Sequence, residues 1–228
     1  GTKLLSATTA ISDTEIPVCW LPLFEWRKRH YPKQRAFTEA IKDKWEVVFL
    51  AGNGTGKTAI LYWNLITLCL GIHPYQSAFA QPPLRVKVLM LDFEHGYGKI
   101  FTDTVLRSQH LPDGSSILPM ATLDPYMIVN FPTKEDKTLN FYNKSMIFFQ
   151  TSEQKKRQHS GTNFDILACD EEPEWSVYDE SKRGLRTAKG GGRILHAFTP
   201  PFDEADKNKG PSWTKFKLID PWEAGDSP

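Results

Sequence analysis

The chain has 228 residues, of which 40% are hydrophobic and 24% charged, and its formal net charge is +1. This length suits one domain, or one domain with a small appendage, and the hydrophobic fraction is sufficient to fill a core. The balanced charge excludes a global basic field, so any contact with nucleic acid has to come from local clusters. Three distant cysteines without a Cys-x-x-Cys pair argue against a disulfide framework or a zinc site.

Short apolar segments alternate with helical patterns along the chain. In chain order, strands are expected at 46–52, 85–93, 126–131, 144–152, 164–170 and 193–198, and helices at 57–70, 98–109 and 176–189. The first helix is apolar nearly all round and is expected to end at Gly71. The strands at 126–131 and 144–152 are expected to pair with each other in antiparallel fashion. The other strands predict a parallel sheet that is covered by helices on both faces.

A glycine-rich turn joins the first expected strand to the first expected helix. The letters "AGNGTGKT" at 51–58 match the phosphate-binding pattern G-x-x-x-x-G-K-[ST], except that Ala51 replaces the first glycine. At such a junction, backbone N–H groups and the positive end of a helix converge on one point and attract phosphate. Lys57 is expected to reach the terminal phosphates, and Thr58 to offer its hydroxyl to Mg²⁺. The predicted ATP-binding residues of this turn are Gly52, Asn53, Gly54, Thr55, Gly56, Lys57 and Thr58.

Two acidic segments are candidates for the carboxylates that such a site needs. A P-loop hydrolase uses one carboxylate for Mg²⁺ and another to orient the attacking water, both at the end of a neighbouring strand. The segment "FDILACDEEP" offers Asp170 for the metal and Glu171 for the water, whereas "VLMLDFEH" offers Asp92 and Glu94. Consecutive acids after a buried strand repel one another, and a bound cation would relieve that repulsion. This argument favours the segment that contains Asp170.

The motifs "AGNGTGKT", "FDILACDEEP" and "RILHAFTPP", in this order, resemble the large terminase subunit of tailed bacteriophages. The resemblance covers about residues 32–201. It implies an Mg²⁺-dependent ATPase, a motor that drives double-stranded viral DNA into a procapsid. The implied fold is an α/β P-loop NTPase of the additional-strand type. It has a mostly parallel central sheet flanked by helices on both faces, and a small N-terminal or lid subdomain.

The resemblance also implies roles for residues outside the two main motifs. Gln34 in "YPKQRAF" matches a glutamine that reads the adenine edge, and Thr199 in "FTPP" matches a residue that couples hydrolysis to movement. Arg157 in "EQKKRQHSG" is the candidate for an arginine that acts in a neighbouring subunit's site. Asn53 stands where some members have an arginine, so charge stabilisation has to come from elsewhere. On the residues alone, Gln34 also fits a surface loop, Thr199 a strand-ending turn and Arg157 a solvated basic loop.

A domain arrangement and a set of partners follow from the same resemblance. Residues 1–201 are expected to form the ATPase domain, with the adenine-motif or lid region at about 1–45. Residues 202–228 are expected to be a linker toward a C-terminal nuclease domain that lies outside this sequence. The implied partners are double-stranded DNA, bound weakly through its phosphates, the portal protein, the small terminase subunit and further copies in a homo-oligomeric ring. The resemblance also implies that no membrane is involved and that the protein acts in the host cytoplasm, with transient docking on the procapsid.

Two other functions use the same phosphate-binding turn. A RecA-type helicase or loader ATPase would take Glu94, after the second expected strand, as its catalytic carboxylate. A P-loop small-molecule kinase would need a lid with several arginines, for which Arg183 and Arg186 are the candidates. Substituting Glu94 and Glu171 in parallel separates the helicase from the packaging motor.

Overall fold

The computed structural model describes residues 30–76, 81–94, 96–98, 128–130, 132–133, 136–151, 163–187, 192–199 and 212–225. The described strands are β1 (Glu46–Leu50), β2 (Arg85–Met90), β3 (Ile128–Asn130), β4 (Thr138–Phe141), β5 (Met146–Thr151), β6 (Ile166–Asp170) and β7 (Arg193–Phe198). The described helices are α2 (Pro32–Asp43), α3 (Lys57–Leu70), α4 (Trp175–Lys182), the 3-10 helix η6 (Arg183–Thr187), the π-helix η7 (Lys215–Ile219) and α5 (Asp220–Glu223).

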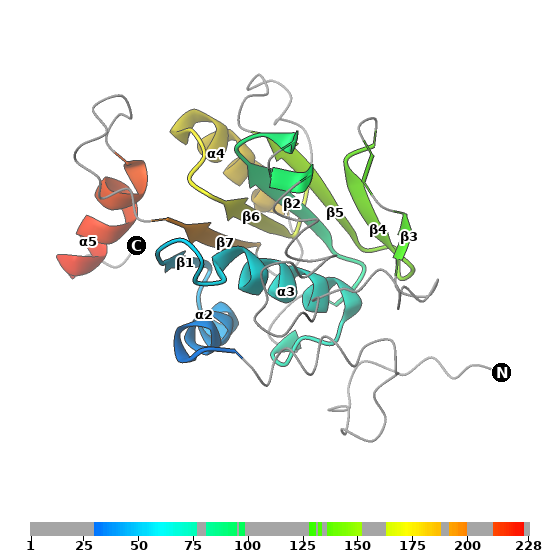
Figure 1. Cartoon of the computed structure of the whole chain (residues 1–228), viewed down its shortest axis with the longest axis horizontal. Helices are drawn as coiled ribbons and strands as arrows, with labels where there is room; N and C mark the ends of the chain where they lie inside the picture. Colours follow the sequence, from blue (N-terminus) through cyan, green and yellow to red (C-terminus); the bar gives the residue numbers. More distant parts are fainter. Residues whose placement is uncertain are drawn as a thin grey trace.

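The strands described form a single seven-stranded sheet in the order β1-β7-β6-β2-β5-β4-β3 (Figure 1). Strands β1, β7, β6, β2 and β5 run parallel, whereas β4 is antiparallel to β5 and β3 is antiparallel to β4. Strand β7 lies between β1, which leads into the glycine-rich turn, and β6, which ends at Asp170. This inserted strand confirms the predicted mostly parallel α/β fold of the additional-strand type.

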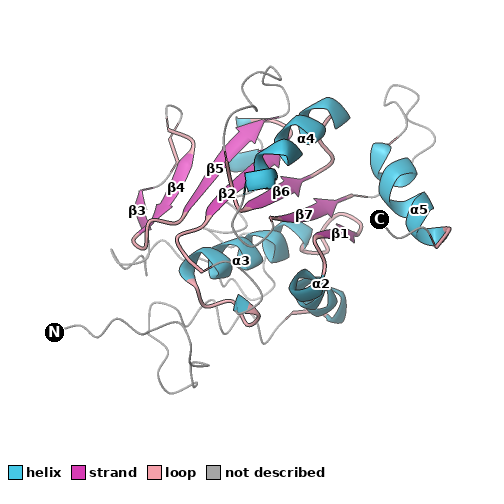
Figure 2. Cartoon of the chain, turned by 180° about the vertical axis from the view of Figure 1, so that it is seen from behind, coloured by secondary structure: helices cyan, strands magenta, loops and turns pink. Residues whose placement is uncertain are grey.

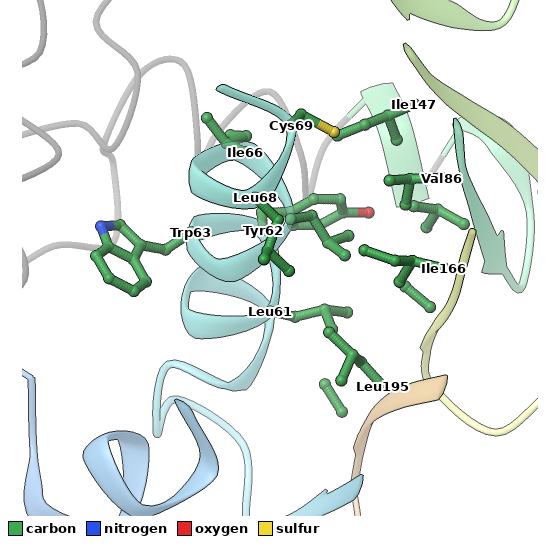
Figure 3. Packing of buried hydrophobic residues seen from close by; sticks show 14 of the residues in the cluster. Leu61, Tyr62, Trp63, Ile66, Leu68, Cys69, Val86, Ile147, Ile166 and Leu195 are labelled. Atoms are coloured by element: carbon green, nitrogen blue, oxygen red, sulfur yellow. The ribbon is translucent and has the colours of Figure 1, made fainter. Parts of the chain in front are cut away.

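The two faces of the sheet are covered by different helices. Every residue of α3 except Thr58 is buried, and Figure 3 shows Leu61 and Tyr62 pointing from this helix toward the strands. The helix α4 covers the opposite face (Figure 2). Tyr178 of α4 and Leu167 of β6 belong to the same buried apolar cluster on this face. Burial of one such large apolar side chain contributes roughly 1.5–3 kcal/mol, so both faces are held by many favourable contacts. The central strands are therefore apolar on both sides, as the continuous apolar sequence runs predict.

The first strand and helix follow the sequence closely. Helix α3 begins at Lys57 and ends at Leu70, as predicted. Gly71 closes it with a φ of 78°, a left-handed conformation that lets its N–H donate back to the carbonyl of Leu68. This accuracy arises because glycines mark both ends of the helix and its apolar residues require burial.

Two predicted details are wrong, both beyond the first helix. The segments 126–131 and 144–152 do not pair directly, because β4 lies between β3 and β5 and pairs with both. Strand β4 has only four residues, of which Leu139 and Phe141 are buried, so its alternating pattern is too short to recognise. The helix expected at 176–189 ends at Lys182 and continues as η6, which contains the poor helix former Gly184. The helix expected at 98–109 lies outside the described residues, except for its first residue, Gly98.

Candidate nucleotide-binding site

The turn between β1 and α3 has a backbone that depends on glycine. Gly54 has a φ of 74° and Gly56 a φ of 78°, the left-handed region that other residues rarely adopt. A Cβ atom on Gly56 would also lie 2.6 Å from Nε2 of Gln34. The turn leads into the N-terminus of α3, where the positive end of the helix dipole lies. This combination of curled backbone and helix N-terminus is suited to binding an anion.

Lys57 folds back into this turn rather than extending into solvent. Its side chain is 6% exposed, and Nζ donates a hydrogen bond of 2.9 Å to the carbonyl of Gly52. The hydroxyl of Thr55 donates to the same carbonyl at 2.7 Å. These two hydrogen bonds hold the ammonium group of Lys57 against the turn, where it could pair with a bound phosphate.

Thr58 and Asp170 bring together the two motifs that the sequence separates. The Oγ1 atom of Thr58 donates a hydrogen bond of 2.9 Å to Oδ1 of Asp170, across 112 positions of sequence. Asp170 is the last residue of β6 and is 4% exposed. A hydroxyl and a carboxylate are hard oxygen ligands of the kind that Mg²⁺ prefers. The two residues therefore fit the metal that this class of site uses.

The environment of Asp170 raises the pKa of its carboxyl group to about 7, mainly because burial disfavours the charged form. The negative charge of Glu171 raises this pKa further. Hydrogen bonding to Thr58 and Tyr62 and the positive charge of Lys57 lower it, but the net shift is upward. A divalent cation placed here would favour the charged carboxylate and remove this cost.

Glu171 is held by the end of the neighbouring strand β7. Its φ of 77° places a non-glycine residue in the left-handed region, which costs about 1–2 kcal/mol. Its Oε2 accepts a hydrogen bond of 3.0 Å from the N–H of Thr199, and its Oε1 accepts one of 2.9 Å from the Thr199 hydroxyl. The same hydroxyl lies 3.1 Å from Oδ1 of Asn53 in the glycine-rich turn. Asn53, Thr199 and Glu171 thus form one chain of contacts between three segments.

Gln34 contacts the glycine-rich turn from helix α2, a helix that was not predicted from the sequence. Its Nε2 donates to the carbonyls of Thr55 at 3.3 Å and Gly56 at 3.4 Å, and its Oε1 accepts the N–H of Tyr31 at 2.9 Å. Gln34 is 4% exposed, so in this arrangement its amide serves the protein backbone. The helix had a signal: the buried positions 34, 37, 38 and 41 recur at helical spacing after a proline.

The remaining predicted residues are not brought to this point. Arg157 lies outside the described residues. Glu94 is exposed, beyond the end of β2, and the hydroxyl of Thr58 is directed to Asp170 instead. Arg183 pairs with Asp179 at 3.2 Å on its own helix, and the side chain of Arg186 is outside the described part.

Two residues near the site were missed by the sequence analysis. Tyr62 affects the pKa of Asp170 by hydrogen bonding, and it follows Thr58 by four positions on α3. This spacing places both residues on one face of the helix, so a signal for Tyr62 was available. Glu172 accepts hydrogen bonds from Thr214 in the C-terminal segment, residues 212–225, and no spacing in the sequence indicates this contact.

Comparison with known proteins rests on structure alone. No protein-family model and no curated protein matches the chain. The large terminase of a thermophilic bacteriophage matches with a TM-score of 0.55 at 12% identity, over 92% of this chain and 43% of that one. The same phage's large terminase in complex with ADP matches with a TM-score of 0.51, at the same identity and coverage. The ATPase domain of a Thermus phage large terminase matches with a TM-score of 0.49 at 14% identity, over 81% of this chain and 67% of that one.

The chain thus spans less than half the length of the full terminase that it matches. Within the described ranges, no helix has both the length and the apolar character that are needed to cross a membrane. Because the sequence identity is low, the match concerns the arrangement of strands and helices alone. On this evidence, the protein has the fold of the part of a phage large terminase that it matches.

Proposed function

We propose that this protein is the motor ATPase domain of a phage large terminase, which hydrolyses ATP to drive double-stranded viral DNA into a procapsid. The observation that carries the proposal is the hydrogen bond between Thr58 and Asp170, which joins the phosphate-binding turn to a buried carboxylate. The shared terminase fold supports the same function. An ATPase requires this juxtaposition, because the carboxylate has to act at the phosphate that the turn holds.

In the proposed reaction, the backbone N–H groups of the glycine-rich turn and the Nζ atom of Lys57 bind the terminal phosphates of ATP. Lys57 leaves the carbonyl of Gly52 to do so, and the side chain needs only a local rotation because it already lies within the turn. Thr58 and Asp170 would hold Mg²⁺, which would neutralise charge on the phosphate oxygens. Glu171 accepts a hydrogen bond from the attacking water and orients it in line with the γ-phosphate.

The contacts of Thr199 support a role in coupling. Both carboxylate oxygens of Glu171 accept one hydrogen bond each from Thr199, and each oxygen keeps a lone pair that can accept a hydrogen bond from a water. Asn53 approaches the same hydroxyl from the phosphate-binding turn. A phosphate that moves Asn53 therefore changes the donor available to Glu171. In this proposal, Thr199 links occupancy of the turn to the position of the catalytic carboxylate.

The reaction needs a positive charge beyond Lys57, because Asn53 cannot supply one. We propose that Arg157 of a neighbouring copy provides it in an assembled ring, as the family pattern implies. Such an arginine contributes roughly 10³–10⁵ in rate in other P-loop enzymes. An Arg157→Ala variant should keep its ATP affinity and lose turnover in the assembled state; normal turnover there would remove Arg157 from the mechanism.

The remaining partners are proposals from the same family pattern: double-stranded DNA, the portal protein, the small terminase subunit and a homo-oligomeric ring, all acting in the host cytoplasm. Contact with DNA through phosphates predicts weak, sequence-independent binding that falls as salt rises. Affinity that is insensitive to salt between low and moderate ionic strength would contradict this part of the proposal.

The function is tested by steady-state ATP hydrolysis and ATP binding in two matched variants. Glu171→Gln should bind ATP normally and lose hydrolysis by about 10²–10⁴-fold, because it removes the group that orients the water. Glu94→Gln changes the same type of group after strand β2 and should retain hydrolysis. If only the Glu94 variant loses hydrolysis while it still binds ATP, the RecA-type helicase or loader replaces the packaging motor.

A further inference from the structure

The C-terminal segment 212–225 packs against the core of the domain through Trp213. This segment lies beside the β1 and β7 side of the sheet (Figure 1). The indole of Trp213 is 9% exposed and stacks on Tyr178 of α4, with ring centroids 4.6 Å apart and an interplanar angle of 17°. Its Nε1 donates a hydrogen bond of 2.7 Å to the carbonyl of Pro173. Trp213 is therefore an anchor with both apolar and directional contacts.

Glu172 provides the second attachment of this segment. One carboxylate oxygen, Oε1, accepts three hydrogen bonds, each 2.9 Å long. The donors are the Ser212 hydroxyl, the Thr214 hydroxyl and the Thr214 N–H. Thr214 is fully buried, and hydrogen bonds to a charged acceptor are worth about twice those between neutral groups. The turn that follows β6 is thus attached to the segment at two consecutive residues, Glu172 and Pro173.

These attachments flank the pair formed by Glu171 and Thr199. Glu172 directly follows Glu171, and Phe198, whose ring centroid lies 6.1 Å from that of Trp213, directly precedes Thr199. The segment consequently contacts the backbone neighbours of both members of the pair. Because Glu171 has a strained left-handed backbone, it keeps that conformation only while its surroundings hold it there.

We infer that Glu172, Trp213 and Thr214 are positioning residues for Glu171: the C-terminal segment holds the turn after β6 so that the Glu171 carboxylate stays at the end of β7. This inference rests on the proposed function of Glu171 in orienting water. It extends that function by placing control of the carboxylate in a segment outside the nucleotide-binding motifs. A movement of this segment changes the hydrolysis rate without contact with the nucleotide.

The test uses conservative variants of the whole chain. Thr214→Val removes the hydroxyl donor to Glu172, whereas Thr214→Ser retains a hydroxyl at this position. Trp213→Phe keeps an aromatic ring for stacking and removes the donor to Pro173. Phe216→Ala is the matched control, since Phe216 lies in the same segment and is 54% exposed.

Two readouts are measured on each variant: amide hydrogen exchange at Glu171 and Thr199, and the kcat and KM of ATP hydrolysis. The Glu171 N–H donates to the carbonyl of Ala197 and the Thr199 N–H to Glu171, so exchange at these amides reports the pairing directly. Thr214→Val and Trp213→Phe should speed exchange at both amides and lower kcat by about tenfold or more, with KM nearly unchanged. Thr214→Ser and Phe216→Ala should resemble the wild type in both readouts.

Wild-type exchange at both amides in Thr214→Val and Trp213→Phe would overturn the inference. Faster exchange combined with unchanged kcat would also overturn it, because the segment would then support the turn without affecting the reaction. If Thr214→Ser lost as much kcat as Thr214→Val, the loss would point to general destabilisation and count against the positioning role. If the wild-type chain itself neither binds nor hydrolyses ATP, the proposed function fails, and the exchange readout still decides whether the segment holds the turn.

Discussion

The side-chain amide of Gln34 lies against Gly56, to whose carbonyl it donates a hydrogen bond of 3.4 Å. The contact joins helix α2 to the residue of the glycine-rich turn that directly precedes helix α3. Because a Cβ atom on Gly56 would lie 2.6 Å from the Gln34 amide nitrogen, the position admits no side chain without a shift of one partner. Two predictions follow from this pair, one for each residue.

Gly56→Ala should lower the free energy of unfolding by about 1–2 kcal/mol, because alanine is disfavoured at the φ of 78° and meets Gln34. Chemical denaturation of the wild type and the variant measures this loss. Gly52→Ala is the matched control for stability, since a Cβ atom on Gly52 has no atom within 4 Å. Equal stability of the two variants would show that the turn adapts to a side chain at Gly56.

Gln34→Ala should weaken the binding of ATP and GTP by a similar factor, because it removes the support of Gln34 for the carbonyls of Thr55 and Gly56. Titration with each nucleotide gives the two affinities, and their ratio is the informative quantity. A loss confined to ATP would instead show that the Gln34 amide turns to the adenine edge when nucleotide binds, as the family resemblance implies.

Thr199→Val should reduce the coupling between DNA and hydrolysis. The variant keeps the N–H that donates to Oε2 of Glu171 and loses the hydroxyl that contacts both Glu171 and Asn53. The ratio of ATP turnover with DNA to turnover without DNA should therefore fall toward one. Thr199→Ser retains the hydroxyl and should keep the wild-type ratio. An unchanged ratio in Thr199→Val would contradict the proposed coupling role.

A buried cluster around Glu46 should make stability depend on pH. Burial raises the pKa of Glu46, but His196, Tyr178 and Lys182 together lower it by more than burial raises it. The pKa in the folded protein therefore lies below the ordinary 4.5. His196 Nε2 is 2.7 Å from the carboxylate. A group with a lowered folded pKa stabilises the protein above its unfolded pKa, and this contribution is lost as the pH falls through the folded value.

Glu46→Gln should accordingly lose about 1–3 kcal/mol of unfolding free energy at pH 7, and its stability should fall less steeply than that of the wild type below pH 4.5. Urea denaturation across acidic and neutral pH measures both effects. Glu39→Gln is the control, because Glu39 is an exposed glutamate on α2. Parallel pH profiles for wild type and Glu46→Gln would show that the cluster does not stabilise the charged carboxylate.

The parts of the fold and the site that could be predicted from the sequence depend on residues that are close together in the chain. The bounds of α3 follow from its glycines and apolar residues, and Asp170 could be inferred to lie near Thr58 because it ends an apolar strand. The burial of Gln34 was missed, because its helix lacked an unbroken apolar face. The anchoring of Trp213 was also missed, since it depends on rings from α4 and β7 that only the folded chain brings together.

Strand β7 has alternating residues that serve different sides of the molecule. Leu195 and Ala197 pack on the side of α3, whereas Ile194 and Phe198 pack on the side of α4 and Trp213. A one-residue slip of this strand would exchange those two sets and carry Thr199 away from Glu171. An error in strand alignment during folding would thus disrupt the hydrophobic interior and the proposed site at the same time.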